Sequence, residues 1–342
     1  MATLAQIAQL AGVTTATVSN VLRGRGKVGE DTKQRVMALA EELGYRPNLN
    51  ARALVEGRPL TLALVVSSIA NPFYPEFALA AEQAARKQGY FLIVCNTNDD
   101  PELEKAYLDQ VGGSLAHGVL VMNADFVEQQ VLLAAEKRGT PVVLCMWERP
   151  EQPPALPSIA VDFYRAGEIA AEHLLALGHR QIGAVVGSER NGNHIWRYRG
   201  FADAVARAGV TDLAQHTVFG HDTIEAGHDA ARTLLSAAQR PTAIFVSNDL
   251  PAIGVLQTAA DMGLRVPSDV SVIGITDINL AHQIRPSLST VAVPTQEAAE
   301  MAVNLLLSLI KGAPGDGARP MLATSKPRLV ARDSTGPAPQ TP

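Results

Sequence analysis

Residues 3–22 read TLAQIAQLAGVTTATVSNVL, and this stretch decides how the chain is interpreted. Thr3 can accept a hydrogen bond from a free amide at the start of a helix, and Gln6 follows at the spacing of a capping box. Apolar residues then recur at helical spacing as far as Gly12, which tolerates the positive φ of a sharp turn. Thr14 can cap a second short helix. Two short helices joined by a glycine-containing turn predict a helix-turn-helix, whose second helix fits the major groove of DNA.

A third helix and a hinge-like segment follow. The stretch 29–44 carries acids in its first turn, where the helix dipole favours them, and apolar residues at core spacing. Gly44 ends this helix, and Pro47 prevents its continuation. After residues 45–48, which read YRPN, the segment 50–55 is too short to be a stable helix alone. We expect that segment to fold only where two copies of the chain meet on DNA.

The order and spacing of these motifs resemble the lactose/galactose-repressor (LacI/GalR) family of transcriptional regulators, along nearly the whole chain. The resemblance implies a helix-turn-helix DNA-binding domain over residues 1–47, a hinge helix and linker over 48–59, and an effector-binding and dimerisation domain over 60–332. Its two lobes are expected at about 60–160 with 288–320, and at about 161–287 with 321–332. The last residues, 333–342, are rich in Pro and Thr and are predicted to be a disordered tail.

From residue 60 onward, short apolar runs alternate with helical stretches, which predicts parallel sheets covered by helices. The alternation restarts after a Pro-rich break at 150–157. The predicted fold class is a small all-α helix-turn-helix head plus an α/β, doubly wound, two-lobed domain like that of periplasmic binding proteins. Ligands of such sheets bind outside the carboxyl ends of the strands. Strands are expected at 60–66, 90–95, 118–122, 141–145, 182–186, 216–219, 243–246 and 270–275.

Charge and composition narrow the class of function. Residues 1–60 carry eight Lys and Arg against five Asp and Glu, a net charge of about +3, whereas the whole chain carries −5. A cationic head is what attraction to phosphates predicts. Because no apolar run approaches the roughly twenty residues of a membrane span and no signal peptide is visible, we expect a cytoplasmic protein without membrane contact. Cys95 and Cys145 end apolar runs and are expected to be reduced core thiols.

We expect an effector-controlled repressor, a homodimer that reads a pseudo-palindromic operator with one recognition helix in each major groove. Three threonines are expected to contact phosphate oxygens: Thr3, Thr14 and Thr17. Three residues of the second helix are expected to contact base edges: Thr15, Ala16 and Asn20. The remaining DNA-binding residues are expected in the basic loop and the hinge: Arg23, Asn50, Arg52 and Leu54. Asn20 can pair with adenine. Leu54 can wedge into a minor-groove step, or alternatively pack against Leu54 of the second copy.

The strand ends supply candidates for an effector site. Positions that line the effector in the family are matched here by Phe73, Tyr74, Trp147, Arg197 and Asn248. Two further candidates follow predicted strands: Asn123 and Asp277. Arg197 stands out because its planar fork can hold two ligand oxygens at once, although it can also be a helix-surface arginine. Trp147 is alternatively a core or rim aromatic residue, and Asn248 is alternatively a helix N-cap.

Two departures from the family bear on the effector. Met146 and Thr276 stand where the family usually offers carboxylates that accept hydrogen bonds from sugar hydroxyls. Arg197 is retained, with His194 and Arg190 close to it in sequence. We therefore favour an anionic effector, a sugar acid or similar carboxylate, over a neutral sugar. A purine base or nucleoside is the remaining alternative, because of the aromatic walls.

Other motifs point away from an enzyme. The stretch 24–29 is a literal G-x-G-x-x-G, but it follows a helix and lies in a basic loop, so it does not indicate a dinucleotide site. The scattered histidines show no metal-ligand spacing, and no nucleophile elbow or Walker loop is present, so no catalytic residue, metal or cofactor is expected. The rival interpretation is a two-lobed solute-binding protein without DNA function. Such a protein would begin with a signal peptide and lack residues 1–58.

Overall fold

The computed structural model describes residues 2–22, 24, 26–45, 60–98, 100–111, 115–122, 129–148, 154–187, 192–312 and 320–339. Contacts divide the chain into two compact units, Met1–Pro59 and Leu60–Pro342. In the part of the chain described, no helix is long and apolar enough to cross a membrane.

The first unit contains the predicted helix-turn-helix, with α1 at Leu4–Ala11 and α2 at Thr15–Leu22. The capping box is present: the Thr3 hydroxyl accepts from the Gln6 amide, and the Gln6 side chain accepts from the Thr3 amide at 2.9 Å. Gly12 ends α1 with a left-handed φ of 64°. A small core of buried Ile, Val and Ala side chains joins the helices. The sequence prediction for this segment is confirmed.

The third helix of this unit is α3, Glu30–Glu42. Glu30 and Asp31 occupy its first turn, as the helix dipole favours. Leu43 is its C-cap, and Gly44 then takes a left-handed φ of 60°, so the chain leaves the helix where the sequence predicts. Val36 and Ala40 contribute its buried face.

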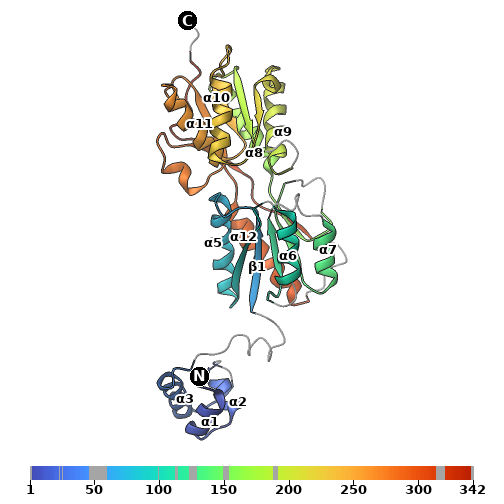
Figure 1. Cartoon of the computed structure of the whole chain (residues 1–342), viewed down its shortest axis with the longest axis vertical. Helices are drawn as coiled ribbons and strands as arrows, with labels where there is room; N and C mark the ends of the chain where they lie inside the picture. Colours follow the sequence, from blue (N-terminus) through green and yellow to red (C-terminus); the bar gives the residue numbers. More distant parts are fainter. Residues whose placement is uncertain are drawn as a thin grey trace. The chain divides into compact units, whose positions relative to one another are not determined.

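Lobe one of the second unit is a sheet covered by helices on both faces (Figure 1). Its strand order is β11-β5-β4-β3-β1-β2, and every pair is parallel. The strands are β1 Thr61–Val66, β2 Phe91–Asn96, β3 Val119–Met122, β4 Val142–Trp147, β5 Ser158–Ala160 and β11 Met321–Ala323. The helices are α5 Phe73–Lys87, α6 Pro101–Val111, α7 Gln129–Lys137 and α12 Thr295–Ile310.

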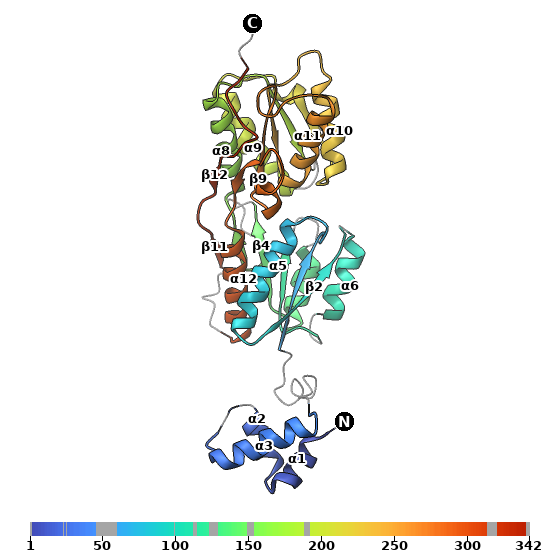
Figure 2. The ribbon, with the colours of Figure 1, turned by 90° about the vertical axis from the view of Figure 1, so that its left-hand side faces the viewer.

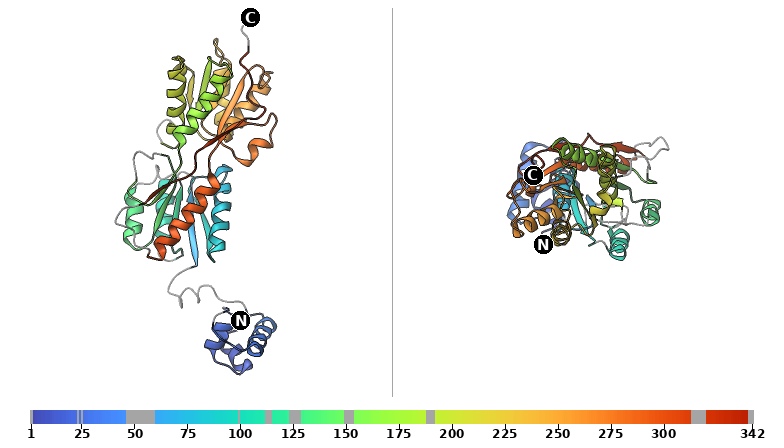
Figure 3. Two further views of the ribbon diagram at one scale, coloured as in Figure 1. Left: turned by 180° about the vertical axis from the view of Figure 1, so that it is seen from behind. Right: turned by 90° about the horizontal axis from the view of Figure 1, so that it is seen from above.

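Strand β1 shows how the sequence builds two layers. Leu62 and Leu64 belong to the hydrophobic cluster that contains α5 and α12, whereas Ala63 and Val65 belong to the cluster that contains α6. Successive side chains of a strand point to opposite faces, so an apolar strand without polar alternation needs helices on both sides. The helices α5 and α12, far apart in sequence, lie side by side on one face (Figures 2 and 3).

Lobe two repeats this plan with the order β12-β10-β9-β8-β6-β7, in which only the β10–β12 pair is antiparallel. Its strands are β6 Ile182–Val186, β7 Thr217–Phe219, β8 Ala243–Val246, β9 Ser271–Thr276, β10 Ser289–Ala292 and β12 Arg328–Val330. Its helices are α8 Phe163–Ala176, α9 Gly192–Arg207, α10 Ile224–Leu235 and α11 Asp249–Asp261. Two short 3₁₀ helices are η1 Leu213–His216 and η2 Asn279–His282.

Glycines set the closest helix contacts of lobe two. A Cβ built at Gly167 of α8 would overlap the carbonyl oxygen of Arg197 in α9, and a Cβ at Gly200 would overlap the carbonyl oxygen of Tyr164. The two backbones therefore meet where neither helix has a side chain. This close crossing brings Arg197 against the ring of Phe163.

The crossings between the lobes differ from the expectation. Residues 289–292 were expected in lobe one but form β10, which pairs in parallel with β9 of lobe two. Residues 321–323 were expected in lobe two but form β11, which pairs with β5 of lobe one. Both segments are short strands, and periodicity within a short strand does not say which sheet edge accepts it.

The prediction of a disordered tail is also wrong for residues 333–339. Ser334 is fully buried, and its hydroxyl donates to the Val272 carbonyl oxygen at 2.6 Å. The Gly336 amide donates to the Ser271 hydroxyl, and the Ala338 amide donates to the Leu177 carbonyl oxygen. Polar composition suggested disorder, but the backbone of this segment finds hydrogen-bond partners along lobe two. Residues 340–342 lie outside the described residues.

Candidate functional site

The face of α2 that was predicted to read DNA is exposed. Thr15, Ala16 and Asn20 are all exposed and share this helix. Thr14 accepts a hydrogen bond from the Thr17 amide at 3.1 Å, and the two hydroxyl oxygens lie 2.9 Å apart. The core side chains Val18 and Val21 hold the helix from its other side. Exposed polar groups on a helix of this kind can reach base edges or phosphates.

Five predicted site residues lie outside the described residues: Arg23, Asn50, Arg52, Leu54 and Asn123. Their assigned roles stay predictions.

A connected group of polar side chains joins the two lobes, and we call it the interlobe cluster. It consists of Asn71 and Glu148 from lobe one and of His194, Arg197, Asp222, Ser247 and Asn248 from lobe two. Nearly every member stands just beyond the carboxyl end of a parallel strand or on the helix that follows one, because that is where the loops of a doubly wound sheet gather.

Arg197 is the centre of one half of the interlobe cluster. It is only 3% exposed; Nη1 donates to the Ser247 carbonyl oxygen at 2.9 Å, and Nη2 donates to Glu148 Oε1 at 2.8 Å. The guanidinium carbon lies 4.1 Å from the ring centroid of Phe163, a cation–π contact. Arg197 is therefore not a surface arginine, and its charge is already matched by a carboxylate of the other lobe.

Asp222 is the centre of the other half. Its Oδ2 accepts from Asn71 Nδ2 at 2.6 Å, across the lobes, and from Asn248 Nδ2 at 2.9 Å. Asn248 is the N-cap of α11, but its side chain makes no capping hydrogen bond. It instead accepts from the Thr276 hydroxyl at 3.4 Å and donates to Asp222. The side chain of Asn248 thus bonds to Asp222 of the interlobe cluster and does not cap helix α11.

His194 links the two halves. Its Nδ1 lies 3.1 Å from the Ser247 hydroxyl, and its Nε2 lies 4.0 Å from Asp222 Oδ2. Burial, and secondarily the nearby charge of Arg197, lower the pKa of His194 to about 3. The imidazole is therefore neutral at physiological pH and adds no positive charge to the cluster.

Asp249, which follows Asn248 of the cluster, forms hydrogen bonds that hold the end of β9 in place. Its carboxylate accepts from the Thr290 hydroxyl at 2.6 Å and from the Ile278 amide at 3.0 Å. Burial raises the pKa of Asp249 to about 6. Thr276, which also donates to Asp249, has a φ of 123°, a conformation that a β-branched residue seldom adopts. Residues held in such conformations gather at functional sites.

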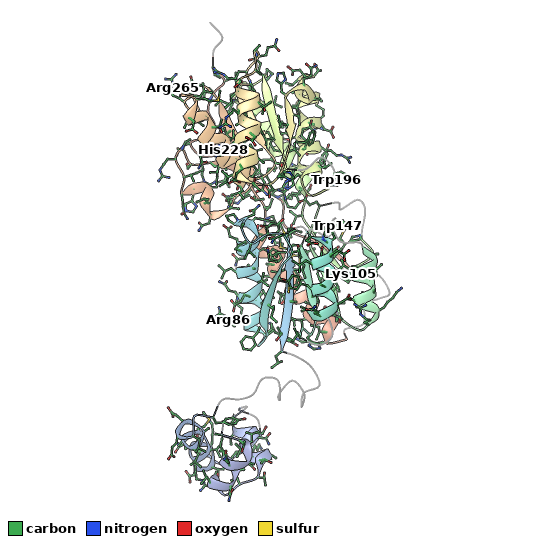
Figure 4. All side chains as sticks on the ribbon, in the orientation of Figure 1. Arg86, Lys105, Trp147, Trp196, His228 and Arg265 are labelled. Atoms are coloured by element: carbon green, nitrogen blue, oxygen red, sulfur yellow. The ribbon has the colours of Figure 1, made fainter. Side chains whose placement is uncertain are left out.

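The predicted aromatic walls are less open than expected. Phe73 and Tyr74 begin α5, pack edge to face with centroids 5.6 Å apart, and belong to the main hydrophobic cluster. Trp147 lies within β4 and joins the smaller cluster of lobe one, so the alternative of a core aromatic describes its position. Figure 4 shows Trp147 and Trp196 near the junction of the lobes.

Asp277 pairs with a residue outside the cluster. Its Oδ1 accepts from Arg332 Nη2 at 2.6 Å. It also lines an open cavity of about 290 Å³ together with Glu76, Glu297 and Lys326. Its carboxylate is therefore engaged in an ion pair within lobe two.

Sequence reasoning missed Glu148 and Asp222. Glu148 lies two residues after Met146. The carboxylate that was expected at position 146 is therefore supplied here from position 148. Asp222 follows the predicted strand 216–219, and the strand-end rule that selected Asn248 could have selected it as well. Within the described residues, no group of three His, Cys, Asp or Glu side chains is arranged to hold a metal ion.

Known proteins resemble this chain over both units. Residues 3–48 match the family described as bacterial regulatory proteins, lacI family, and residues 171–335 match the periplasmic binding protein-like domain. The chain is 34% identical over 339 residues to the HTH-type transcriptional repressor PurR of Edwardsiella ictaluri (strain 93-146), covering 99% of this chain and 98% of that protein. The corresponding PurR of Yersinia enterocolitica serotype O:8 / biotype 1B (strain NCTC 13174 / 8081) is 33% identical with the same coverage.

Solved structures agree. The lac repressor dimer bound to operator and the anti-inducer ONPF has a TM-score of 0.83 at 25% identity, covering 98% of this chain and 99% of that one. The transcriptional regulator CelR in complex with cellobiose has a TM-score of 0.70 at 29% identity, covering 98% and 100%. Because relatives above 30% identity match almost end to end, and because both the helix-turn-helix head and the two-lobed domain are present, the chain belongs to the lacI family of bacterial regulatory proteins.

Proposed function

We propose that this protein is a transcriptional repressor that acts as a homodimer on a pseudo-palindromic operator, with its DNA affinity set by a small metabolite bound between the lobes. It acts by binding and turns over no ligand. The observation that carries the proposal is the exposed face of α2, with Thr15, Ala16 and Asn20 together on a capped helix-turn-helix. The relatives named as repressors support the same function.

Charge supports the DNA-binding role. The first sixty residues are cationic while the whole chain is anionic. Neutralising phosphates releases counterions from DNA, so binding through such a head falls steeply as salt rises. Asn20 contributes sequence preference, because an amide side chain can pair bidentately with adenine in the major groove.

Lobe one supports the homodimer. Strand β2 is the edge strand of its sheet, and it exposes Phe91, Ile93 and Val94, while Leu79 of the adjacent α5 is 60% exposed. Proteins usually cover an exposed sheet edge that carries apolar side chains, because it can otherwise pair with other chains. A second copy of this chain covers it by two-fold symmetry, which matches the two-fold symmetry of an operator. The lac repressor structure, which is that of a dimer bound to operator, supports a dimer.

The interlobe cluster supports control by a metabolite. Both of its cross-lobe contacts, Arg197–Glu148 and Asn71–Asp222, are polar and lie at strand ends where such folds bind ligands. A ligand that prefers one arrangement of the lobes shifts the population of that arrangement, and couples to DNA by about 1–3 kcal/mol.

The deciding experiment is an unbiased selection of duplex DNA with the purified full-length protein. We expect enrichment of a pseudo-palindromic sequence, binding that weakens with salt, and no turnover of any metabolite in the same preparation. The Asn20→Ala protein serves as the control for sequence reading. Selection of no sequence above background would refute the repressor and favour a solute-binding protein without DNA function.

A further inference from the structure

The interlobe cluster brings two carboxylates to the place where the lobes meet, although the sequence suggested that acids had been lost there. Glu148 reaches the cluster from the end of β4, and Asp222 reaches it from the loop between β7 and α10. Both side chains are largely buried, at 7% and 22% exposed respectively. An ionised carboxylate only accepts hydrogen bonds, so a ligand group that contacts either acid must be a donor.

The positive charge that favoured an anionic ligand is already engaged. Arg197 gives one fork nitrogen to Glu148 and the other to the Ser247 carbonyl oxygen. His194 remains neutral because it is buried beside Arg197. A ligand carboxylate would have to displace Glu148 from the guanidinium and then lie beside it, which is repulsive in a site of low dielectric.

We propose that Asp222 and Glu148 make the interlobe site select an uncharged, hydroxyl-bearing ligand such as a neutral sugar over the matching sugar acid. This inference rests on the proposed effector role of the same site. Ligand hydroxyls donate to Asp222 in the place of Asn71 or Asn248, and Arg197 donates to a ligand oxygen while it keeps Glu148 as its counter-ion. The ligand thus exchanges contacts that now join the lobes, which links occupancy to lobe closure.

The test compares matched pairs of ligands on the full-length protein. The panel is D-ribose with D-ribonate, D-glucose with D-gluconate, D-galactose with D-galactonate, and cellobiose with cellobionate, with hypoxanthine and guanine as further members. Thermal shift identifies binders at concentrations up to about 10 mM, and calorimetry gives their dissociation constants. We expect at least one neutral sugar to bind, and its acid to bind at least tenfold more weakly.

Two variants test which carboxylate sets the selectivity. Asp222→Asn keeps the shape of the side chain and removes its charge, so it should weaken the neutral sugar by roughly 10-fold to 100-fold, the worth of a hydrogen bond to a charged group, and narrow the gap to the acid. Glu148→Gln should leave Arg197 able to bind a ligand carboxylate, and so should strengthen the acid. The matched control is Asp229→Asn on α10, which removes the same charge from a side chain that is 83% exposed and should leave both affinities as they are.

Each outcome decides the proposal. An acid that binds more tightly than its neutral partner, a purine that binds where no neutral sugar does, a panel without any neutral binder, or an unchanged ratio in Asp222→Asn would overturn it. Operator selection with the same preparations is scored separately. A protein that selects an operator but prefers the acid refutes only the ligand class, whereas a protein that selects no DNA refutes the repressor.

Discussion

Glu148 Oε1 and Arg197 Nη2 lie 2.8 Å apart, and this buried ion pair joins the end of β4 in lobe one to helix α9 in lobe two. The pair also occupies Nη2, one nitrogen of the fork that a ligand was expected to use. Its strength therefore bears both on the packing of the lobes and on what the site can bind.

Removing one partner of this pair should destabilise the domain. In Arg197→Met the Glu148 carboxylate stays buried without its cation, a loss of about 3–5 kcal/mol in the free energy of unfolding. Arg165 on α8 offers the comparison, because it pairs with Glu172 at 2.6 Å on a more exposed surface. Arg165→Met should lose at most about 1 kcal/mol. Urea unfolding of both variants measures the difference. Equal losses of unfolding free energy would show that the buried pair stabilises the domain no more than the exposed one.

Asn20→Ala should reduce discrimination at one base position in each half-site by about 1–3 kcal/mol, because the amide can pair bidentately with adenine. Competition binding against single-base operator variants at fixed salt measures this. If every operator variant weakens by the same factor, Asn20 contacts the DNA backbone instead.

Gly167→Ala should loosen the crossing of α8 and α9, since the added Cβ would overlap the Arg197 carbonyl oxygen and the backbones would have to move apart. Overpacking of this kind costs about 1–3 kcal/mol or more, and we expect ligand response to fall with it, because Arg197 moves. Gly220→Ala is the control, as its Cβ would meet only the Ala226 methyl group at an ordinary 3.7 Å. Melting temperatures and ligand titrations of the two proteins should differ clearly; similar values for both would mean that the crossing tolerates a methyl group.

The buried His194 predicts a pH dependence with a definite sign. Its folded pKa is lowered to about 3 from an ordinary 6.5, so the unfolded chain takes up a proton that the folded chain refuses. The stability linked to this group is present above pH 6.5 and is lost as the pH falls towards 3. His194→Asn should therefore flatten the decline in unfolding free energy between pH 7 and 4. If the unfolding free energy of the variant and of the wild type falls equally with pH, the pH dependence comes from other groups.

Asp249 predicts the opposite sign over a narrower range. Its folded pKa is raised to about 6 from an ordinary 3.8, so its linked stability is present below pH 3.8 and is lost as the pH rises through 6. Relative to the wild type, Asp249→Asn should gain stability between pH 5 and 7, because an amide has no charge to bury. Chemical unfolding at several pH values measures that difference. A difference in unfolding free energy that does not change with pH would contradict the link between Asp249 ionisation and stability.

Residue patterns with short spacing were predictable. Thr3 and Gln6, three residues apart, form the capping box, and Gly12 ends the helix as expected. The alternation of apolar runs and helical stretches located β1–β4 and β6–β9 to within two residues, but it did not predict the short strands β5, β10, β11 and β12. These features repeat at fixed local periods, which the order of residues displays directly. They determined the helix-turn-helix head and the α/β class of the rest.

Long-range contacts were decided only by the tertiary structure. Asn71 and Asp222 are 151 residues apart, and Glu148 and Arg197 are 49 apart, yet each pair meets across the lobes. Ser334 was assigned to a tail, but it is buried against β9. No local period encodes such pairs, because they depend on the order of strands within each sheet and on how two sheets bring their carboxyl ends together. The sequence alone determined what kind of protein this is, and the packing of the lobes decided which charges meet at its site.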